Sequence, residues 1–392
     1  MTTNFEPGPS FSDGIKYEVD LTGQNSDVEF EDSGSWINDP FDPEKIDVVT
    51  RTPTVSLLLS RIKRGTIDLA PDFQRHAGIW NDTNQSKLIE SLLLRIPLPT
   101  FYAAETDEEV WAVVDGIQRL TAISRFVDPQ AMELKPLVLQ NLGYLDKLNG
   151  LRFPELPGRL KTRLEETEVV LHLIRRGTPE EVKFNIFARI NTGGMPLTAQ
   201  ELRHALIPGR ARLLLAELAD SPEFKAVTLG SVATGRMADR EMVLRFIAFW
   251  RTDPETYRKQ DFDKFLRVAM SDINTASDAE VERVGASFRR AMTVAQEIFG
   301  RHAFRKQRRN QIGRYPINKA LFETIAVNLA GCSPEQVGRL IQRQVEVNEA
   351  MVDLFAQPDF DRAISVGTGD VAKVRLRFAA VNALIRDHDG SV

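Results

Sequence analysis

The chain of 392 residues lacks most features that mark secreted, disulfide-rich or membrane proteins. It contains a single cysteine, Cys332, so an internal disulfide is impossible and a cysteine-based zinc site has no further ligands. No apolar run approaches the roughly eighteen residues of a membrane-spanning helix. The first residues are neither basic nor apolar, unlike a secretory signal. We therefore expect a protein of the reducing cytoplasm that does not enter a membrane.

The residue clusters of several common enzymes are also missing from the sequence. Five histidines are scattered along the chain, and no His or Asn follows the closing Asp387–Gly390 to complete a metal site. Neither a Walker-type phosphate loop nor a nucleophile–base arrangement is present. An HNH-like nuclease is therefore not expected within this chain.

The net charge of −5 is distributed unevenly along the chain. Residues 1–44 contain eleven acidic side chains and one basic side chain, Lys16, which leaves 49 basic and 44 acidic residues in the remainder. A phosphate-bearing partner is compatible with that positive remainder. Because the N-terminal segment is rich in small and polar residues without periodicity, we predict that residues 1–48 form a largely disordered acidic arm.

Residues 49–195 carry patterns of both helices and strands. Helical spacing over 55–65 ends at a glycine, and a second helix is expected over 85–96. Between and after these helices, short strands are expected at IDLAP, TFYAAE, VWAVVD and, over 168–176, EVVLHLIRR. An acidic turn separates the middle two, which predicts adjacent strands. A helix, IQRLTAISRFV, follows directly. We predict a mixed α/β domain.

Strand patterns cease beyond residue 196. Eight successive segments instead repeat apolar residues at the 3.6-residue period of a helix. No fixed-length repeat accompanies them, so a helical bundle is favoured over a solenoid. The fold class is therefore predicted as α+β, with a mixed α/β domain over 49–195 followed by an all-α helical domain over 196–392.

The sequence VVDGIQR contains the sharpest candidate site. Asp115 and Gly116 stand between an apolar strand and a helix that begins at once, and helix N-termini offer free N–H groups to phosphate. Arg119, one turn into that helix, could fork onto phosphate oxygens. Asp115 could hold Mg²⁺ or orient a water. The same pattern also fits an ordinary strand–turn–helix in which Asp115 caps the helix.

Two loops carry further candidate residues. Gln74 and Arg75 could line a polar site, although aromatic neighbours could equally anchor their loop to the core. Asn191 and Gly193 follow a predicted helix in FARINTGG. Successive glycines there could form a nest of amides for an anion, or simply end the helix.

A basic segment interrupts the helical region. Residues 301–314 contain six Lys or Arg and no acid, flanked by aromatic residues. Such a segment could neutralise several phosphates and stack on a base, or it could be a solvated loop. The candidate nucleic-acid-binding residues are Arg305, Lys306, Arg308 and Arg309.

Several motifs together resemble a known family. PDFQR, QSKLIESLLLRIPLP, VVDGIQRLTAI and FARINTGGMPLTAQELRHAL occur in order within residues 52–210. They resemble the N-terminal domain of GmrSD-type modification-dependent restriction enzymes (their GmrS half) and of SspE-like phage-defence proteins. The segment DREMVLRFIAFW at 239–250 is also similar to that family.

The resemblance implies a ParB/sulfiredoxin-like fold that hydrolyses a nucleoside triphosphate at an Asp-Gly-x-Gln-Arg motif, with Mg²⁺. Carried over, the catalytic residues are Asp115, Gln118 and Arg119, with Asp115 as metal ligand. The implied nucleotide-binding residues are Gly116, Gln74, Arg75, Asn191 and Gly193. Members commonly have Gln at the position of Ile117, so hydrolysis here depends on whether that Gln acts chemically or only packs.

Three functions follow from these patterns. The preferred one is a nucleotide-binding, NTP-hydrolysing regulatory component of an anti-phage or restriction system, whose nuclease or other defence partner is a separate chain. The second is a non-hydrolysing, ParB-like module in which nucleotide gates DNA binding or partner recruitment. The third is a protein-interaction scaffold. The expected partners are nucleotide, DNA and a second protein, and self-association is compatible with all three.

Overall fold

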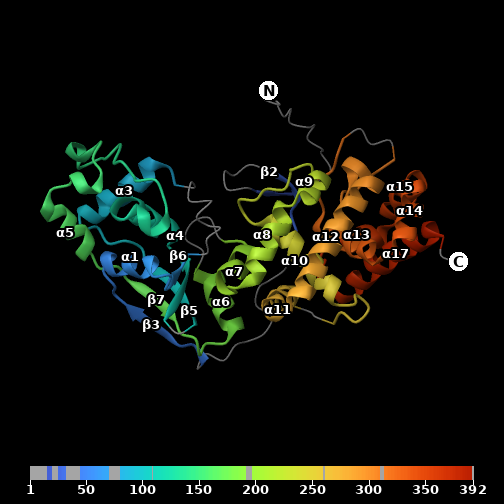
Figure 1. The fold of residues 1–392 in the computed structure, drawn as a ribbon, viewed down its shortest axis with the longest axis horizontal. Helices are drawn as coiled ribbons and strands as arrows, with labels where there is room; N and C mark the ends of the chain where they lie inside the picture. The colour runs from blue at the N-terminus through green and yellow to red at the C-terminus, as the bar shows by residue number, and fades with distance from the viewer. Residues whose placement is uncertain are drawn as a thin grey trace. The chain divides into compact units, whose positions relative to one another are not determined.

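The structure, a computed structural model, describes residues 16–19, 25–31, 45–69, 80–107, 109–190, 197–258, 261–309 and 313–390. Contacts divide the chain into two compact units (Figure 1). The α/β unit comprises residues 39–197 and 201–208, and the helical unit comprises residues 1–38, 198–200 and 209–392. A mixed α/β part is thus followed by a helical part, which confirms the predicted order of fold classes.

A five-stranded sheet forms the centre of the α/β unit. In spatial order its strands are β3 (Val48–Arg51), β7 (Leu171–Ile174), β5 (Phe101–Asp107), β6 (Val110–Asp115) and β4 (Ile67–Asp68). The β3–β7 and β5–β6 pairs are antiparallel, whereas β7–β5 and β6–β4 are parallel. The antiparallel β5–β6 pair confirms the predicted neighbouring strands. The sequence missed β3 because this strand is mostly exposed and carries no apolar alternation.

Side-chain caps determine where two helices of this unit begin. The Thr54 hydroxyl accepts a hydrogen bond from the N–H of Leu57 and caps α1. The Asn81 side chain accepts one from Asn84 in the same way, so the second helix begins at residue 82 rather than at the predicted 85. The helices are α1 (Val55–Lys63), α3 (Asp82–Leu93), α4 (Ile117–Val127), α5 (Gly158–Glu166) and α6 (Glu180–Ile190), with short 3-10 helices η2 (Pro129–Met132), η3 (Asp146–Leu148) and η4 (Phe153–Glu155).

Beyond residue 196 the described residues contain the helices that the periodicity predicts, except that the single helix expected over 334–355 forms two helices with Arg343 between them, and two further short helices, α9 and α16, are present. After α7 (Ala199–Leu206) come α8 (Arg210–Asp220), α9 (Pro222–Thr228), α10 (Ala238–Arg251), α11 (Phe262–Thr275), α12 (Asp278–Phe299), η5 (Gly300–His302), α13 (Lys319–Gly331), α14 (Pro334–Gln342), α15 (Gln344–Phe355), α16 (Pro358–Ser365) and α17 (Val371–Asp389). α13 packs against α10, α12 and α17. Because it is covered on several sides, its apolar side chains, including Leu321 and Phe322, are fully buried.

Part of the predicted acidic arm lies among the described residues and contains two paired strands; most of residues 1–48 lie outside the described part of the chain, so the largely disordered arm stays a prediction. β1 (Tyr17–Val19) and β2 (Asn25–Glu29) pair antiparallel, with Tyr17 opposite Glu29. We call residues 16–19 and 25–31 the N-terminal ribbon. It belongs to the helical unit, and Val28 at its centre is completely buried. Apolar alternation does not mark this strand, because the alternating residues of β2 are acidic and pair with another part of the chain.

No helix in the described residues is long and apolar enough to cross a membrane.

A buried carboxylate organises the loop after η2 in the α/β unit. Glu90 on α3 is 5% exposed and accepts hydrogen bonds from the backbone N–H groups of Gly143, Tyr144 and Leu145. Burial by itself raises the pKa of Glu90, but these three N–H donors outweigh it and hold the pKa below its usual value. The charged form of Glu90 is therefore the form that the fold prefers.

We expect Glu90→Gln to lower the free energy of unfolding at neutral pH by about 1–3 kcal/mol, because the amide cannot satisfy three donors. Since the folded-state pKa of Glu90 is depressed, its contribution is present above the unfolded pKa of about 4.3 and is lost as pH falls through the folded value. Urea unfolding at neutral and acidic pH measures both effects. The exposed Glu166 on α5, changed to Gln, is the matched control; equal losses in the two variants would contradict this role.

Candidate functional site

The turn from β6 into α4 has the geometry of an anion site. Gly116 adopts a left-handed conformation with a φ of 102°. A Cβ atom at this position would overlap the ring of Phe101, so both the backbone and the available space require glycine. Among the described residues, no side chain caps α4. The first N–H groups of the helix therefore remain available to a ligand.

Arg119 is held inside the fold beside this turn. Its side chain is 10% exposed, and Nη2 donates to Asp115 Oδ2 at 2.7 Å and to the Thr100 carbonyl at 3.2 Å. Nη1 donates to the carbonyl of Pro99, and the guanidinium lies 4.4 Å from the centre of the Phe101 ring. Burial lowers the pKa of Arg119 and the Asp115 carboxylate opposes that shift. The guanidinium stays charged, so Asp115 and Arg119, both predicted as site residues, form an ion pair.

The two residues between the glycine and the arginine face different surroundings. Ile117 is 7% exposed and contributes to the core, which is where an apolar side chain after such a turn is expected. The Oε1 atom of Gln118 is buried without a hydrogen-bond partner among the described residues. Buried acceptors are normally paired. Gln118 therefore offers an unused acceptor next to the turn.

β4 ends at the same edge of the sheet as the turn. β4 runs parallel to β6, with Asp68 beside Ala112, so the chain leaves β4 toward the edge at which Asp115 ends β6. Ligands of α/β sheets commonly bind at such carboxyl ends. The loop residues that follow β4 include two of the predicted site residues. Four predicted site residues lie outside the described part of the chain: Gln74, Arg75, Asn191 and Gly193.

Sequence reasoning missed the contribution of β5 to this site. The carbonyls just before the strand bind Arg119, and Tyr102 lies opposite Asp115 in the register. Tyr102 also packs against His172 of β7, with ring centroids 5.2 Å apart. The only signal was the predicted pairing of β5 with β6, which places the start of one strand beside the end of the other.

Two of the basic residues do not form the exposed surface that the sequence predicts. Arg305 is 1% exposed, and its two terminal nitrogens donate to both carboxylate oxygens of Asp27, at 3.0 and 2.8 Å. Lys306 donates to Glu29 at 2.9 Å. The N-terminal ribbon covers both side chains and supplies the carboxylates that pair with them. A cation buried in protein requires such a nearby anion.

The other two basic residues are exposed. Arg309 forms an ion pair with Asp353 of α15, and both side chains are largely exposed to solvent. The guanidinium of Arg308 lies 5.8 Å from the centre of the Tyr315 ring. The four residues of the basic segment therefore divide between a buried pair and a surface pair.

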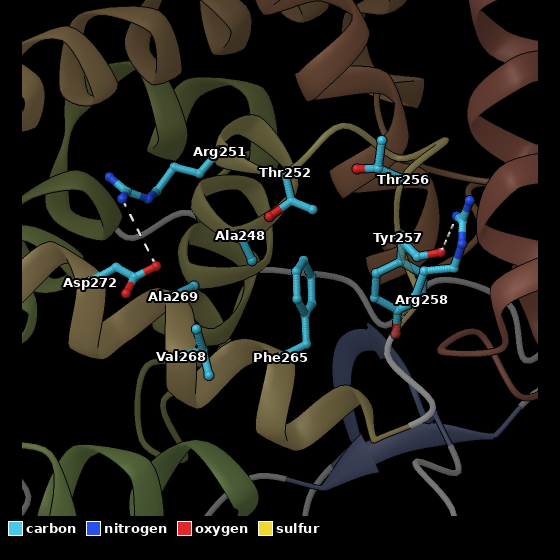
Figure 2. Close-up of a pocket in the computed structure, with 10 residues that line it drawn as sticks. All are labelled: Ala248, Arg251, Thr252, Thr256, Tyr257, Arg258, Phe265, Val268, Ala269 and Asp272. Carbon is cyan, nitrogen blue, oxygen red and sulfur yellow. Dashed lines mark hydrogen bonds and ion pairs between the residues drawn. The ribbon is translucent and has the colours of Figure 1, made fainter.

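A separate small cavity of about 160 Å³ lies in the helical unit (Figure 2). Phe265 and two alanines form much of its lining, and two of its polar side chains are bound to other parts of the protein. Arg251 pairs with Glu280, and the Tyr257 hydroxyl donates to the Gly369 carbonyl at 3.0 Å. None of the predicted site residues lines this cavity.

The described residues near the turn provide too few metal ligands to hold a metal ion without a bound molecule. No group of three or more His, Cys, Asp or Glu side chains in the described residues is placed to hold a metal ion. The Asp115 side chain is 44% exposed. Mg²⁺ in nucleotide sites is typically held by one or two carboxylates together with phosphate oxygens. Asp115 therefore fits a nucleotide-bound Mg²⁺ better than a metal held by protein alone.

Comparison with known proteins supports the resemblance that the motifs predict. Residues 55–208 match the family described as "GmrSD restriction endonuclease, N-terminal domain". The match spans most of the α/β unit, including the β6–α4 turn. No curated protein and no solved structure matches the chain.

We expect Gly116→Ala to lower the free energy of unfolding of the α/β unit by about 3 kcal/mol or more, because backbone strain and overlap with Phe101 add together. Gly65→Ala is the matched control: Gly65 has a φ of 71°, but nothing lies within 4 Å of the added carbon. That variant should lose only about 1–2 kcal/mol from strain. Urea unfolding measures both, and similar losses would show that the contact with Phe101 is unimportant.

Proposed function

We propose that the α/β unit binds a nucleoside triphosphate at the β6–α4 turn and hydrolyses it, as the regulatory component of a restriction or anti-phage system. The nuclease would be supplied by another chain. The mixed sheet with its flanking helices is compatible with a ParB/sulfiredoxin-like arrangement, which we include in the proposal. The observation that carries it is the uncapped, left-handed glycine turn beside the Asp115–Arg119 ion pair.

The charges at the turn suit a phosphate bound with a cation. The α4 N-terminus attracts an anion through its free N–H groups and its dipole. Asp115 alone would repel phosphate, but Arg119 balances its charge, and a bound Mg²⁺ would do so as well. Mg²⁺ would be held by Asp115 and would supply charge neutralisation on the phosphates. Gln118 supplies an unpaired acceptor that could orient a water.

A second candidate function is a nucleotide-gated latch without hydrolysis. One observation favours it. Ile117 is buried in the core and cannot act on a ligand, whereas the resemblance to the family implies Gln at this position. Arg119 already donates to two carbonyls and to Asp115, so a bound phosphate would have to compete for these donors. The lack of Gln at position 117 would reduce turnover more than binding, whereas the competition at Arg119 would weaken binding.

Asp115→Asn should weaken Mg²⁺-dependent NTP binding by about tenfold or more and abolish phosphate release, because one charge-assisted ligand is lost. Asp128→Asn is the control: Asp128 follows the other end of α4 and pairs with Lys63 at 3.6 Å. Calorimetric titration with each NTP and steady-state phosphate release provide the measurements. Wild type that binds without turnover would favour the latch, and wild type that binds no nucleotide would refute both functions.

Arg119→Ala should abolish nucleotide binding, since its guanidinium holds both Asp115 and the chain before β5 in place. Arg119→Lys keeps the charge but loses the multiple bonds, and should retain part of the affinity. The unfolding temperature of each variant is measured alongside. A folded Arg119→Ala protein with wild-type affinity would place the nucleotide elsewhere.

A further inference from the structure

The N-terminal ribbon covers a cluster of cations on the helical unit. Asp27 binds Arg305 through both carboxylate oxygens and also binds Arg314 at 3.0 Å. Glu29 binds Lys306 at 2.9 Å and accepts from Asn318 at 3.0 Å. Each of these two carboxylates therefore occupies both of its oxygens on groups of the helical unit.

Two more ribbon carboxylates extend the row. Glu31 binds Arg245 of α10, and Glu18 binds Lys319 at the start of α13. The side chains of Arg245 and Lys319 are almost fully buried, at 3% and 6% exposure. The ribbon carboxylates hold the following cations, which we call the cation row: Arg245, Arg305, Lys306, Arg314 and Lys319.

The ribbon acids repeat with the period of a strand. Asp27 and Glu29 occupy alternate positions of β2, so their carboxylates extend from the same side at an interval of about 6.5 Å, and Glu31 follows two residues beyond the end of the strand. Main-chain bonds fix this register: the N–H of Glu29 donates to the Ile317 carbonyl, and the N–H of Ile317 donates to the Asp27 carbonyl, both at 2.8 Å. The result is an extended line of single negative charges facing a line of cations.

The cations of the row differ in how far they depend on the ribbon for a negatively charged partner. Arg245 has carboxylates of its own unit nearby, Glu241 at 2.9 Å and Glu323 at 3.5 Å. The carboxylate that binds Arg305 and Arg314 is Asp27 of the ribbon. If the ribbon withdrew, both arginines would lose this anion, and leaving the buried Arg305 unpaired is costly unless another anion replaces it.

We propose that the cation row is a binding site for the phosphate backbone of a nucleic acid, and that the N-terminal ribbon occupies it as an internal mimic of that backbone. Three arginines suit the bidentate recognition of phosphate oxygens. The extended, evenly spaced carboxylates stand in for consecutive phosphates. The segment that contributes Arg305, Lys306 and Arg314 carries no acid of its own. Nucleic acid and the N-terminal ribbon therefore compete for the cation row.

The test neutralises the mimic in the full-length chain. The variant Asp27→Asn/Glu29→Gln/Glu31→Gln keeps the shape of the ribbon and removes three charges. We expect its affinity for a short labelled duplex or single-stranded DNA to rise about tenfold or more over wild type. The slope of log affinity against log salt should become steeper by about two to three, since each phosphate bound contributes roughly 0.7–0.9. NTP binding, which uses the other unit, should not change.

The control variant removes the same number of negative charges at other positions of the helical unit. Glu217→Gln/Asp220→Asn/Asp278→Asn neutralises three exposed carboxylates that pair with Arg289, Lys225 and Arg210. Its DNA affinity should stay near that of wild type. Equal gains in both triple variants would show a general charge effect and overturn the proposal. So would tighter binding of polyglutamate without any binding of DNA, which would indicate an acidic protein partner.

A reversible disulfide between the ribbon and the helical unit tests whether the ribbon must leave the cation row before nucleic acid binds. Val28 and Ile317 are bridge partners, and the chain has one other cysteine, which is buried. Adding Val28→Cys/Ile317→Cys to the neutralised variant should abolish the gain in DNA affinity when oxidised and restore it when reduced. Undiminished DNA binding by the locked protein would refute competition. If the triple variant does not fold, Glu29→Gln alone should give a smaller gain, and no gain would overturn the proposal.

Discussion

The packing of this protein depends on one electrostatic constraint: a guanidinium buried in protein must be paired with an anion. Removing one partner from a buried ion pair typically costs about 3–5 kcal/mol, whereas an exposed pair contributes little. In the helical unit, Arg377 and Glu323 are both fully buried and bind each other, and Glu323 also lies near Arg245. Burial tends to lower the pKa of Arg245, but Glu31 and Glu241 reverse the effect and raise it. The ribbon is thus part of the charge balance of the core.

The same constraint organises the candidate nucleotide site. Arg119 is buried beside Asp115, and the two charges hold the end of β6, the start of β5 and the first turn of α4 in one arrangement. In this ion pair the two charges balance each other within the fold. Both proposed sites therefore follow one principle, in which protein groups satisfy the charges that a phosphate ligand would otherwise meet.

The sequence was sufficient for the parts of the site that are local. The strand–Asp–Gly–helix pattern predicted Asp115, Gly116 and Arg119 on one turn, since consecutive residues and one helical turn fix their separation. It could not show that Arg119 would bind carbonyls twenty residues earlier in the chain, because that contact depends on the antiparallel register of β5 and β6. It also predicted the basic segment as a surface, since periodicity contains no information on what covers a segment.

Composition and periodicity alone predicted the order of an α/β part and a helical part, and most of the helices, because these depend on which residues share a face within one element. Tertiary structure alone decided the role of the N-terminal acids. Every second residue from Asp27 to Glu31 is acidic, which is the side-chain period of a strand. Acids at that spacing indicate a strand only when cations pair with them in the folded protein. Those cations lie more than two hundred residues away in the chain, and only folding brings the two together.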